Sequence, residues 1–275
     1  MCPRTLSQIL QSGAFFWYNP FGEKNERAIE KGVVVSKMYL VRHGQASFGE
    51  LNYDRLSELG GRQCRLLGEY WARQGVALDA VYLGTLARQR ASLDRVREAY
   101  AAAGLPFPEP IVMPEWNEYN MQALLTGTVP QTIAQDPQVA ALLRELAPDG
   151  KPDFVHNKKA LNRLLGVVMD LWVDGKLGAT GMGTWSEFTR RVHRGLDRIM
   201  SDHPSGRSVA VFTSGGPVSA ALQRALAVPD KPAMQVGWVI VNSSVSEFRF
   251  DAHRFSLVSF NTFPHLEGNG LMTVR

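Results

Sequence analysis

The chain has 275 residues, long enough to bury a substantial core in one large domain or two small ones. Its hydrophobic fraction of 45% and charged fraction of 20% are those of an ordinary soluble globular protein. The formal net charge of +4 suits an anionic small substrate, but without a dense Lys/Arg run it argues against a nucleic-acid partner. Cys2 and Cys64 form neither a disulfide framework nor a zinc motif, and they favour a cytoplasmic location. No apolar run approaches the ~20 residues that span a bilayer, so we expect no membrane association.

The first part of the chain alternates strand and helix patterns. Residues 1–37 show no sustained apolar pattern, so we expect a peripheral N-terminal extension, with a natural start at Met38 as an alternative. The apolar run 38–41 predicts a buried strand, and the periodicity of 56–75 predicts a helix. A short strand at 80–83 and a helix at 85–103 follow, and prolines then break the pattern.

The second part resumes this alternation after a segment without strands. Residues 121–180 predict a mainly helical insertion over the site, with helices at 139–146 and 159–172. A helix at 184–200 begins with a capping box of Thr184 and Glu187. A strand at 208–213, a helix at 217–226 and closing strands at 236–242, 244–250 and 254–260 complete the chain. We therefore predict a single α/β domain over 38–275, a three-layer sandwich with a mostly parallel central sheet and helices on both faces.

Polar side chains follow three of the predicted strands. Arg42 and His43 come after the first strand, Arg88 shortly after the second, and Ser214 with a glycine pair after the strand at 208–213. If these strands are parallel neighbours, the three junctions open on one edge of the sheet. Arginine forks and free helix N–H groups at one edge suit a phosphate group.

At these junctions the chain resembles the histidine phosphatase superfamily, whose branch includes the cofactor-dependent phosphoglycerate mutases. The resemblance covers about 38–120 and 184–261 and depends on four motifs in order: Leu40-Val41-Arg42-His43-Gly44-Gln45, Leu56-Ser57-Glu58-Leu59-Gly60, Gly84-Thr85-Leu86-Ala87-Arg88 and Trp116-Asn117-Glu118-Tyr119. It implies a phosphoglycerate mutase-like fold and a nucleophilic His43 that forms a phosphohistidine. It also implies that Arg42 and Arg88 hold the equatorial phosphoryl oxygens, with Arg88 rather than Arg90 at the matching spacing.

The remaining site residues are less sharply indicated. The leaving oxygen needs a proton, and either Glu115 or Glu118 could supply it, with the Asn-Glu-aromatic order favouring Glu118. Gln45 and Asn52 are candidates to hydrogen-bond the substrate, or else to satisfy the loop backbone.

One position departs from the family pattern. The family normally places a second histidine before the glycine pair, and this chain has Ser214. We expect Ser214 and Gly215 to contact substrate through neutral hydrogen bonds, with slower chemistry than a charged donor would give. The alternative is that Ser214 caps the following helix.

The sequence as a whole predicts a phosphomonoesterase that acts on a small phosphorylated metabolite or a phosphoprotein. The alternatives are mutase-type phosphoryl transfer and a catalytically weak phosphate-binding or scaffold protein. A serine hydrolase with Ser214 as nucleophile is disfavoured, because Phe212 stands where a nucleophile elbow requires glycine. This chemistry requires no metal and no organic cofactor. The oligomeric state stays open, with a homodimer as one option.

Overall fold

The computed structural model divides the chain into two compact units, residues 1–34 and 35–275. It describes residues 35–47, 54–120, 136–146, 157–177 and 183–274, all of them in the second unit. The predicted N-terminal extension therefore lies almost entirely outside the described residues. Within the described ranges, no helix combines the length and the apolar character that crossing a bilayer requires.

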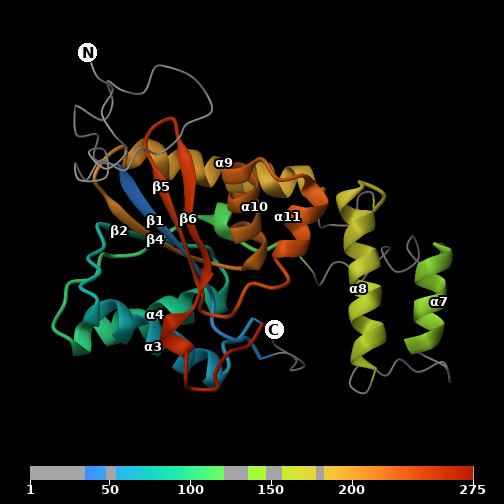
Figure 1. Cartoon of the computed structure of the whole chain (residues 1–275), viewed down its shortest axis with the longest axis horizontal. Coiled ribbons are helices and arrows are strands. Elements are labelled where there is room, and N and C mark those ends of the chain that lie inside the picture. Colours follow the sequence, from blue (N-terminus) through green and yellow to red (C-terminus); the bar gives the residue numbers. More distant parts are fainter. Residues whose placement is uncertain (1–34, 48–53, 121–135, 147–156, 178–182, 275) are drawn as a thin grey trace, which may run out of the picture. The chain divides into compact units, whose positions relative to one another are not determined.

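A six-stranded mixed sheet forms the centre of the second unit (Figure 1). Its strand order is β3-β2-β4-β1-β5-β6, and the strands are listed in chain order: β1 Ser36–Arg42, β2 Ala80–Leu83, β3 Ile111–Val112, β4 Ser208–Thr213, β5 Val245–Phe250 and β6 Phe255–Thr262. Pairing is parallel from β3 through β1, whereas β5 and β6 are antiparallel. The predicted mostly parallel sheet is confirmed.

Helices cover both faces of this sheet. Below it in Figure 1 lie α3 (Glu58–Arg73) and α4 (Ala87–Ala102), and above it lie α9 (Trp185–Asp202) and α10 (Gly215–Leu226). The other helical elements are α7 Pro137–Leu146, α8 Lys158–Val173, α11 Asp230–Val236 and the short 3-10 helices η1 Pro114–Trp116 and η2 Pro264–Leu266. Thr184 and Glu187 form the predicted capping box at the start of α9.

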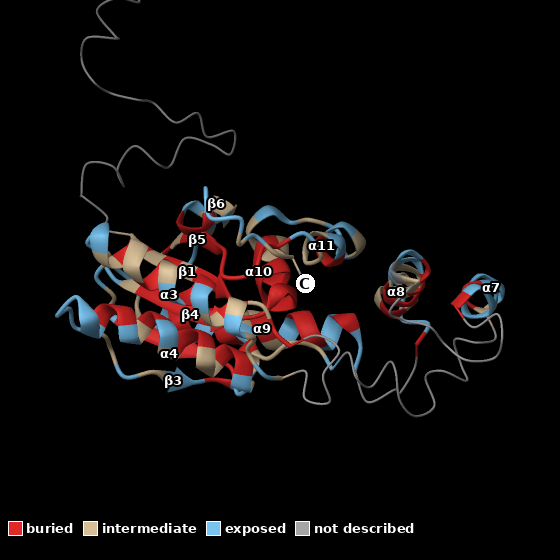
Figure 2. Ribbon diagram, turned by 90° about the horizontal axis from the view of Figure 1, so that it is seen from below, coloured by how far each residue is buried: buried red, intermediate tan, exposed pale blue. Residues whose placement is uncertain are grey.

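Alternate strand residues supply two separate cores, one on each face. Leu40 and Val211 pack with α9 and α10, while Val41 and Phe212 pack with α3 and α4. All four side chains are at most 1% exposed. Because successive strand residues point to opposite faces, strands buried on both faces read as continuous apolar runs. Figure 2 shows buried residues along the sheet and on the inner sides of these helices.

The structure corrects one predicted element. Residues 236–242 are predicted as a strand, but α11 ends at Val236 and the following residues form turns. Their backbone groups are bonded outside any ladder: Val241 N donates to Asn261 Oδ1, and Asn242 N donates to the carbonyl of Thr273. A short apolar run does not by itself distinguish a strand from a buried turn. The predicted insertion, 121–180, contains α7 and α8 among its described residues. Its remaining segments, 121–135, 147–156 and 178–180, lie outside the described residues.

Candidate active site

The ends of β1, β2 and β4 meet at one edge of the sheet, as the junction residues predict. The register pairs Arg42 with Thr213, and the backbone N–H of His43 continues the ladder by donating to the Thr213 carbonyl at 2.9 Å. This register brings His43 and Ser214 side by side just beyond the strands. Helices α4 and α10 begin at the same edge, so the positive ends of their dipoles add positive potential there.

His43 is buried with one ring nitrogen directed at an arginine. Its Nδ1 lies 2.7 Å from the Gly44 carbonyl, which can only accept, so Nδ1 carries the proton. Its Nε2 then accepts from Arg88 Nε at 3.1 Å. Burial, followed by the charges of Arg88 and Arg42, holds the pKa of His43 well below its usual value of 6.5. The ring is therefore neutral, with a lone pair on Nε2.

Both predicted phosphate-binding arginines are held in place by hydrogen bonds to other parts of the chain. Arg88 NH1 pairs with Asp54 at 2.8 Å, and Asp54 Oδ2 also accepts from the Ala87 backbone N–H at the start of α4. Arg42 NH1 donates to the carbonyls of Ile240 and Val274, the latter at 2.7 Å. Both arginines are under 10% exposed, with Arg42 at 8% and Arg88 at 6%. Such anchoring limits the rotamers of a long side chain before any ligand binds.

Of the two candidate acids, the structure brings Glu118 to this edge. Its Oε2 accepts from the Gly216 N–H at the start of α10, at 3.1 Å. Burial raises the pKa of Glu118 above its usual value, and the hydrogen bond from Gly216 and the charge of Arg88 oppose that rise. Glu115 instead packs against α9, where a β-carbon on Gly195 would lie 2.9 Å from its own β-carbon.

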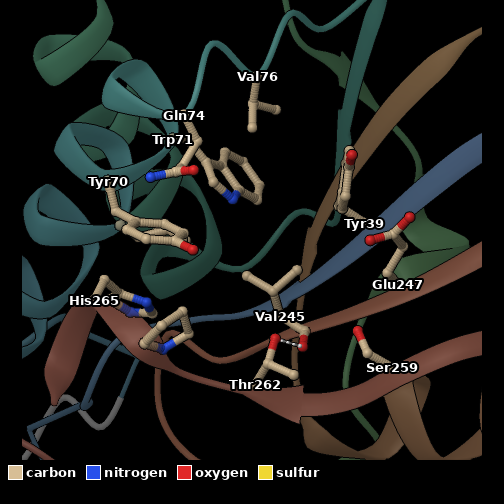
Figure 3. A pocket seen from close by; sticks show the side chains of 12 residues that line it. Tyr39, Tyr70, Trp71, Gln74, Val76, Val245, Glu247, Ser259, Thr262 and His265 are labelled. Carbon is tan, nitrogen blue, oxygen red and sulfur yellow. Dashed lines mark hydrogen bonds between the residues drawn. The ribbon is translucent and has the colours of Figure 1, made fainter.

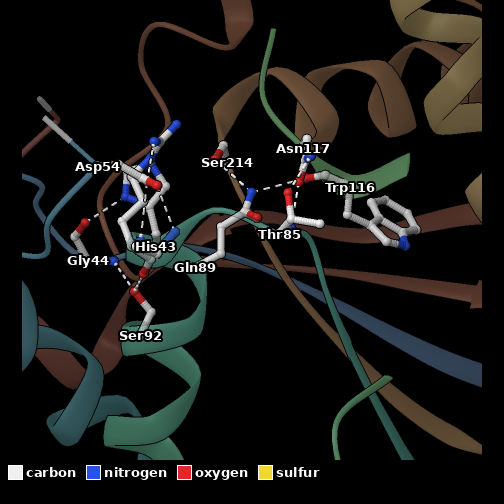
Figure 4. Close-up of polar contacts among 11 residues, drawn as sticks. His43, Gly44, Asp54, Thr85, Gln89, Ser92, Trp116, Asn117 and Ser214 are labelled. Carbon is white, nitrogen blue, oxygen red and sulfur yellow. Dashed lines mark hydrogen bonds and ion pairs between the residues drawn. The ribbon is translucent and has the colours of Figure 1, made fainter. Parts of the chain in front are cut away.

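Ser214 occupies the N-cap position of α10, but its side chain makes no capping bond. Ser214 is therefore the predicted N-cap residue by position, but its side chain does not supply the capping hydrogen bond. The hydroxyl is fully buried and accepts from Gln89 Nε2 at 3.0 Å (Figure 4). Gly215 lies close to Arg42: a β-carbon there would be 3.9 Å from Arg42 Nε and 2.9 Å from the Gly237 carbonyl oxygen.

Of the two amide residues predicted to contact substrate, the structure describes Gln45 but not Asn52. The Gln45 side-chain oxygen accepts from Ser57 Oγ at 3.1 Å, and its backbone N–H donates to Gln63. These bonds connect the loop after His43 to the start of α3. Asn52 lies outside the described residues.

Four residues of the site's surroundings escape prediction from sequence. Asp54 and Gln89 are described above, and Asn117 bonds Thr85 through both its amide atoms, at 2.6 and 2.8 Å. Arg191 of α9 donates to the carbonyls of the segment that carries Glu118, those of Pro114, Glu115 and Asn117. No sequence pattern marks Asp54, Gln89 or Arg191, because their partners are distant in the chain. Asn117 belongs to a motif that carries the family resemblance, but that motif does not indicate its contact with Thr85.

Two cavities are found among the described residues. One, of about 490 Å³, adjoins the candidate site and is lined by Glu118, Tyr119, Phe188, Arg191 and Arg194 among others. The other, of about 230 Å³, lies between α3 and the strands β1, β5 and β6, with Tyr39, Tyr70, Trp71 and His265 around it (Figure 3). None of the predicted site residues lines this second cavity.

Comparison with known proteins identifies the class to which this fold and site belong. The family model of the histidine phosphatase superfamily, branch 1, matches residues 38–174 and 169–262. The chain belongs to this superfamily, whose members bind phosphorylated substrates. A search of curated proteins gives no match.

Solved structures with this fold include a mutase and two phosphatases. The phosphoglycerate mutase of Bacillus anthracis str. Sterne has a TM-score of 0.57 at 14% identity, over 86% of this chain and 97% of that chain. A mycobacterial glucosyl-3-phosphoglycerate phosphatase has a TM-score of 0.53 at 17% identity, over 82% of this chain and 98% of that one. The phosphoserine phosphatase of Entamoeba histolytica, in complex with 3-phosphoglyceric acid, has a TM-score of 0.54 at 16% identity, over 84% and 99%. At these identities the likeness is one of fold.

Proposed function

We propose that the protein is a phosphomonoesterase that works through a phosphohistidine on a small phosphorylated metabolite or a phosphoprotein. The observation that carries this proposal is the state of His43. Its Nδ1 proton is held by the Gly44 carbonyl, its pKa is lowered by burial and by two arginines, and its Nε2 faces Arg88. A buried neutral imidazole held in this way is a nucleophile poised beside a phosphate-binding cation.

The first half-reaction transfers the phosphoryl group to the protein. When substrate binds, the Arg88 Nε–H turns from His43 Nε2 to a phosphoryl oxygen, which frees the Nε2 lone pair. Nε2 then attacks phosphorus in line as the bond to the ester oxygen breaks, and Arg42 and Arg88 neutralise the equatorial oxygens. Glu118, whose pKa is raised by burial, donates its proton to the leaving oxygen. The cavity beside Glu118 receives the leaving group, with Tyr119 and Phe188 as apolar walls.

The second half-reaction returns the protein to its starting state. The Glu118 carboxylate takes a proton from water, the resulting hydroxide attacks phosphorus, and the P–N bond breaks to leave neutral His43 and inorganic phosphate. Mutase-type transfer would instead return the phosphoryl group to a bound product. Arg191, a basic residue of the adjoining cavity, is committed to three backbone carbonyls, which favours hydrolysis over a dedicated acid-binding clamp.

The first test is an aryl phosphatase assay combined with trapping of acid-labile phosphate on the protein. We expect turnover with phenyl phosphate, label on the wild type, and neither in His43→Ala. His203→Asn is a matched control, because His203 hydrogen-bonds Tyr82 and not a site residue. Turnover without trapped phosphate would overturn the covalent mechanism. Phosphate binding without turnover, unchanged in His43→Ala, would favour the scaffold alternative.

A further inference from the structure

Two consecutive residues at the start of α4 reach the two side chains that follow the last paired residues of β1 and β4. Arg88 Nε donates to His43 Nε2 at 3.1 Å, and Gln89 Nε2 donates to Ser214 Oγ at 3.0 Å. Figure 4 shows Gln89 extending from α4 toward Ser214 and Trp116. The site therefore holds a charged donor on the nucleophile and, beside it, a neutral donor on the serine.

The orientation of the Gln89 amide follows from its second contact. Gln89 Nε2 also lies 3.0 Å from the Trp116 carbonyl, an atom that can only accept. The nitrogen is therefore assigned to this side, because a flipped amide would set its oxygen against the Trp116 carbonyl oxygen. Gln89 and Ser214 are both fully buried, so neither contact is exchanged with bulk water.

This arrangement determines which way the serine hydroxyl points. Because Ser214 Oγ receives a hydrogen from Gln89, its own O–H cannot be directed at the amide nitrogen. Among the described residues, no acceptor is found for that hydroxyl hydrogen, since the Ser214 side chain makes no capping bond and its hydrogen bond with Gln89 is one that it accepts. A fully buried O–H without an acceptor lies next to His43, where a phosphoryl group would arrive.

We propose that Gln89 is a positioning residue that orients the Ser214 hydroxyl as a hydrogen-bond donor to the phosphoryl group on or near His43. This inference rests on the proposed function. Gln89 itself touches no substrate, because both of its N–H groups are used by Ser214 and Trp116. Gln89 and Ser214 act as one unit, a neutral donor at the junction between β4 and α10.

A double-mutant cycle tests this unit. Gln89→Met keeps the volume and removes the donor, and Ser214→Ala removes the hydroxyl. We expect each single variant to lower kcat for phenyl phosphate about tenfold with little change in KM, since a donor used in the transition state is lost. The double variant should be no slower than Ser214→Ala, because Gln89 acts only through Ser214. Losses that multiply in the double variant would overturn the proposal.

A matched variant separates this role from support of the Trp116 segment. Thr213 Oγ1 also donates to the Trp116 carbonyl, at 2.7 Å, without touching Ser214. Thr213→Val therefore measures the effect of losing a hydrogen bond to the Trp116 carbonyl alone, and we expect it to lower kcat less than Gln89→Met does. If Gln89→Met fails to fold, Gln89→Leu also removes the amide donor from this buried position, and it should likewise slow Ser214→Ala no further.

The same cycle run on vanadate binding needs no turnover. Vanadate takes the five-coordinate geometry of the transferring phosphoryl group, and we expect its Kd to rise about tenfold in each single variant and no further in the double variant. A wild type that neither hydrolyses phenyl phosphate nor traps phosphate would overturn the proposed function, while the vanadate cycle would still decide the role of Gln89. Additive effects on vanadate binding would reject that role.

Discussion

His43 and Glu118 are shifted in opposite directions by the same buried edge. Burial disfavours the charged form of each group, so the pKa of the imidazole falls and the pKa of the carboxyl rises. The arginines reinforce the shift at His43 and oppose it at Glu118. A neutral nucleophile and a protonated acid therefore coexist over a wider pH range than free side chains would allow.

This pair predicts a defined pH profile of kcat. The acid limb should lie well below pH 6.5, because His43 protonates only below its lowered pKa. The alkaline limb should follow the raised pKa of Glu118, and Glu118→Gln should remove it. We expect Glu118→Gln to lower kcat about a hundredfold with phenyl phosphate. The loss should be smaller with 4-nitrophenyl phosphate, whose leaving oxygen needs less protonation. An unchanged alkaline limb in Glu118→Gln would exclude Glu118 as the acid.

At the scale of elements, two glycines bring the His43 loop against α3. A β-carbon on Gly44 would overlap the Gly60 carbonyl, and one on Gly60 would overlap the Gln45 carbonyl. Both contacts are with backbone atoms, which cannot rotate away. Gly44 and Gly60 therefore both permit the same close contact between the backbone of the His43 loop and the backbone of α3.

Neighbouring positions of α3 offer a direct comparison. We expect Gly60→Ala to lower the free energy of unfolding by about 1–3 kcal/mol through overpacking, and to lower kcat by displacing the His43 loop. Gly61→Ala should leave stability unchanged or raise it by up to about 1 kcal/mol, because the added methyl would lie no closer than 3.6 Å to Arg95 and favours the helix. Urea unfolding of both variants measures the difference, and equal stabilities would contradict this account.

For the molecule as a whole, the buried histidine His265 couples stability to pH. Burial lowers the pKa of His265 from 6.5 to about 4, and its Nε2 lies 2.8 Å from Ser243 Oγ. The unfolded chain binds a proton at this residue below pH 6.5, while the folded chain does so only near pH 4. The stabilising contribution of neutral His265 is therefore complete above pH 6.5 and is lost as the pH falls toward 4.

We expect the free energy of unfolding to fall by on the order of 3 kcal/mol from His265 between pH 6.5 and 4. His43, with its lowered pKa, adds to the slope in the same direction. His265→Gln should be less stable at neutral pH and should show a shallower pH dependence than the wild type. Parallel stability curves for the two proteins, measured by urea unfolding across this range, would argue against the assignment.

The strands and the phosphate-related site can be predicted from the sequence by itself, because both depend on short stretches of consecutive residues. Apolar runs bounded by glycine mark β2 and β4 at their observed bounds, and the residues after the parallel strands reveal the phosphate-binding edge. His43, Arg42, Arg88 and Ser214 are predicted for this reason, and the structure brings them together. Their roles in catalysis remain predictions.

Only the tertiary structure distinguishes between candidate residues that are close in sequence, and only it identifies their hydrogen-bond partners. It separates Glu118 from Glu115 by packing one on α10 and the other on α9, and it places turns at 237–242. It also joins Gln89 to Ser214 across 125 positions of sequence. Local patterns report which face of an element is buried, whereas hydrogen-bond partners depend on how separate elements pack. The sequence therefore predicted the candidate nucleophile and its arginines, and packing determined how Glu118 and the Ser214 hydroxyl are held.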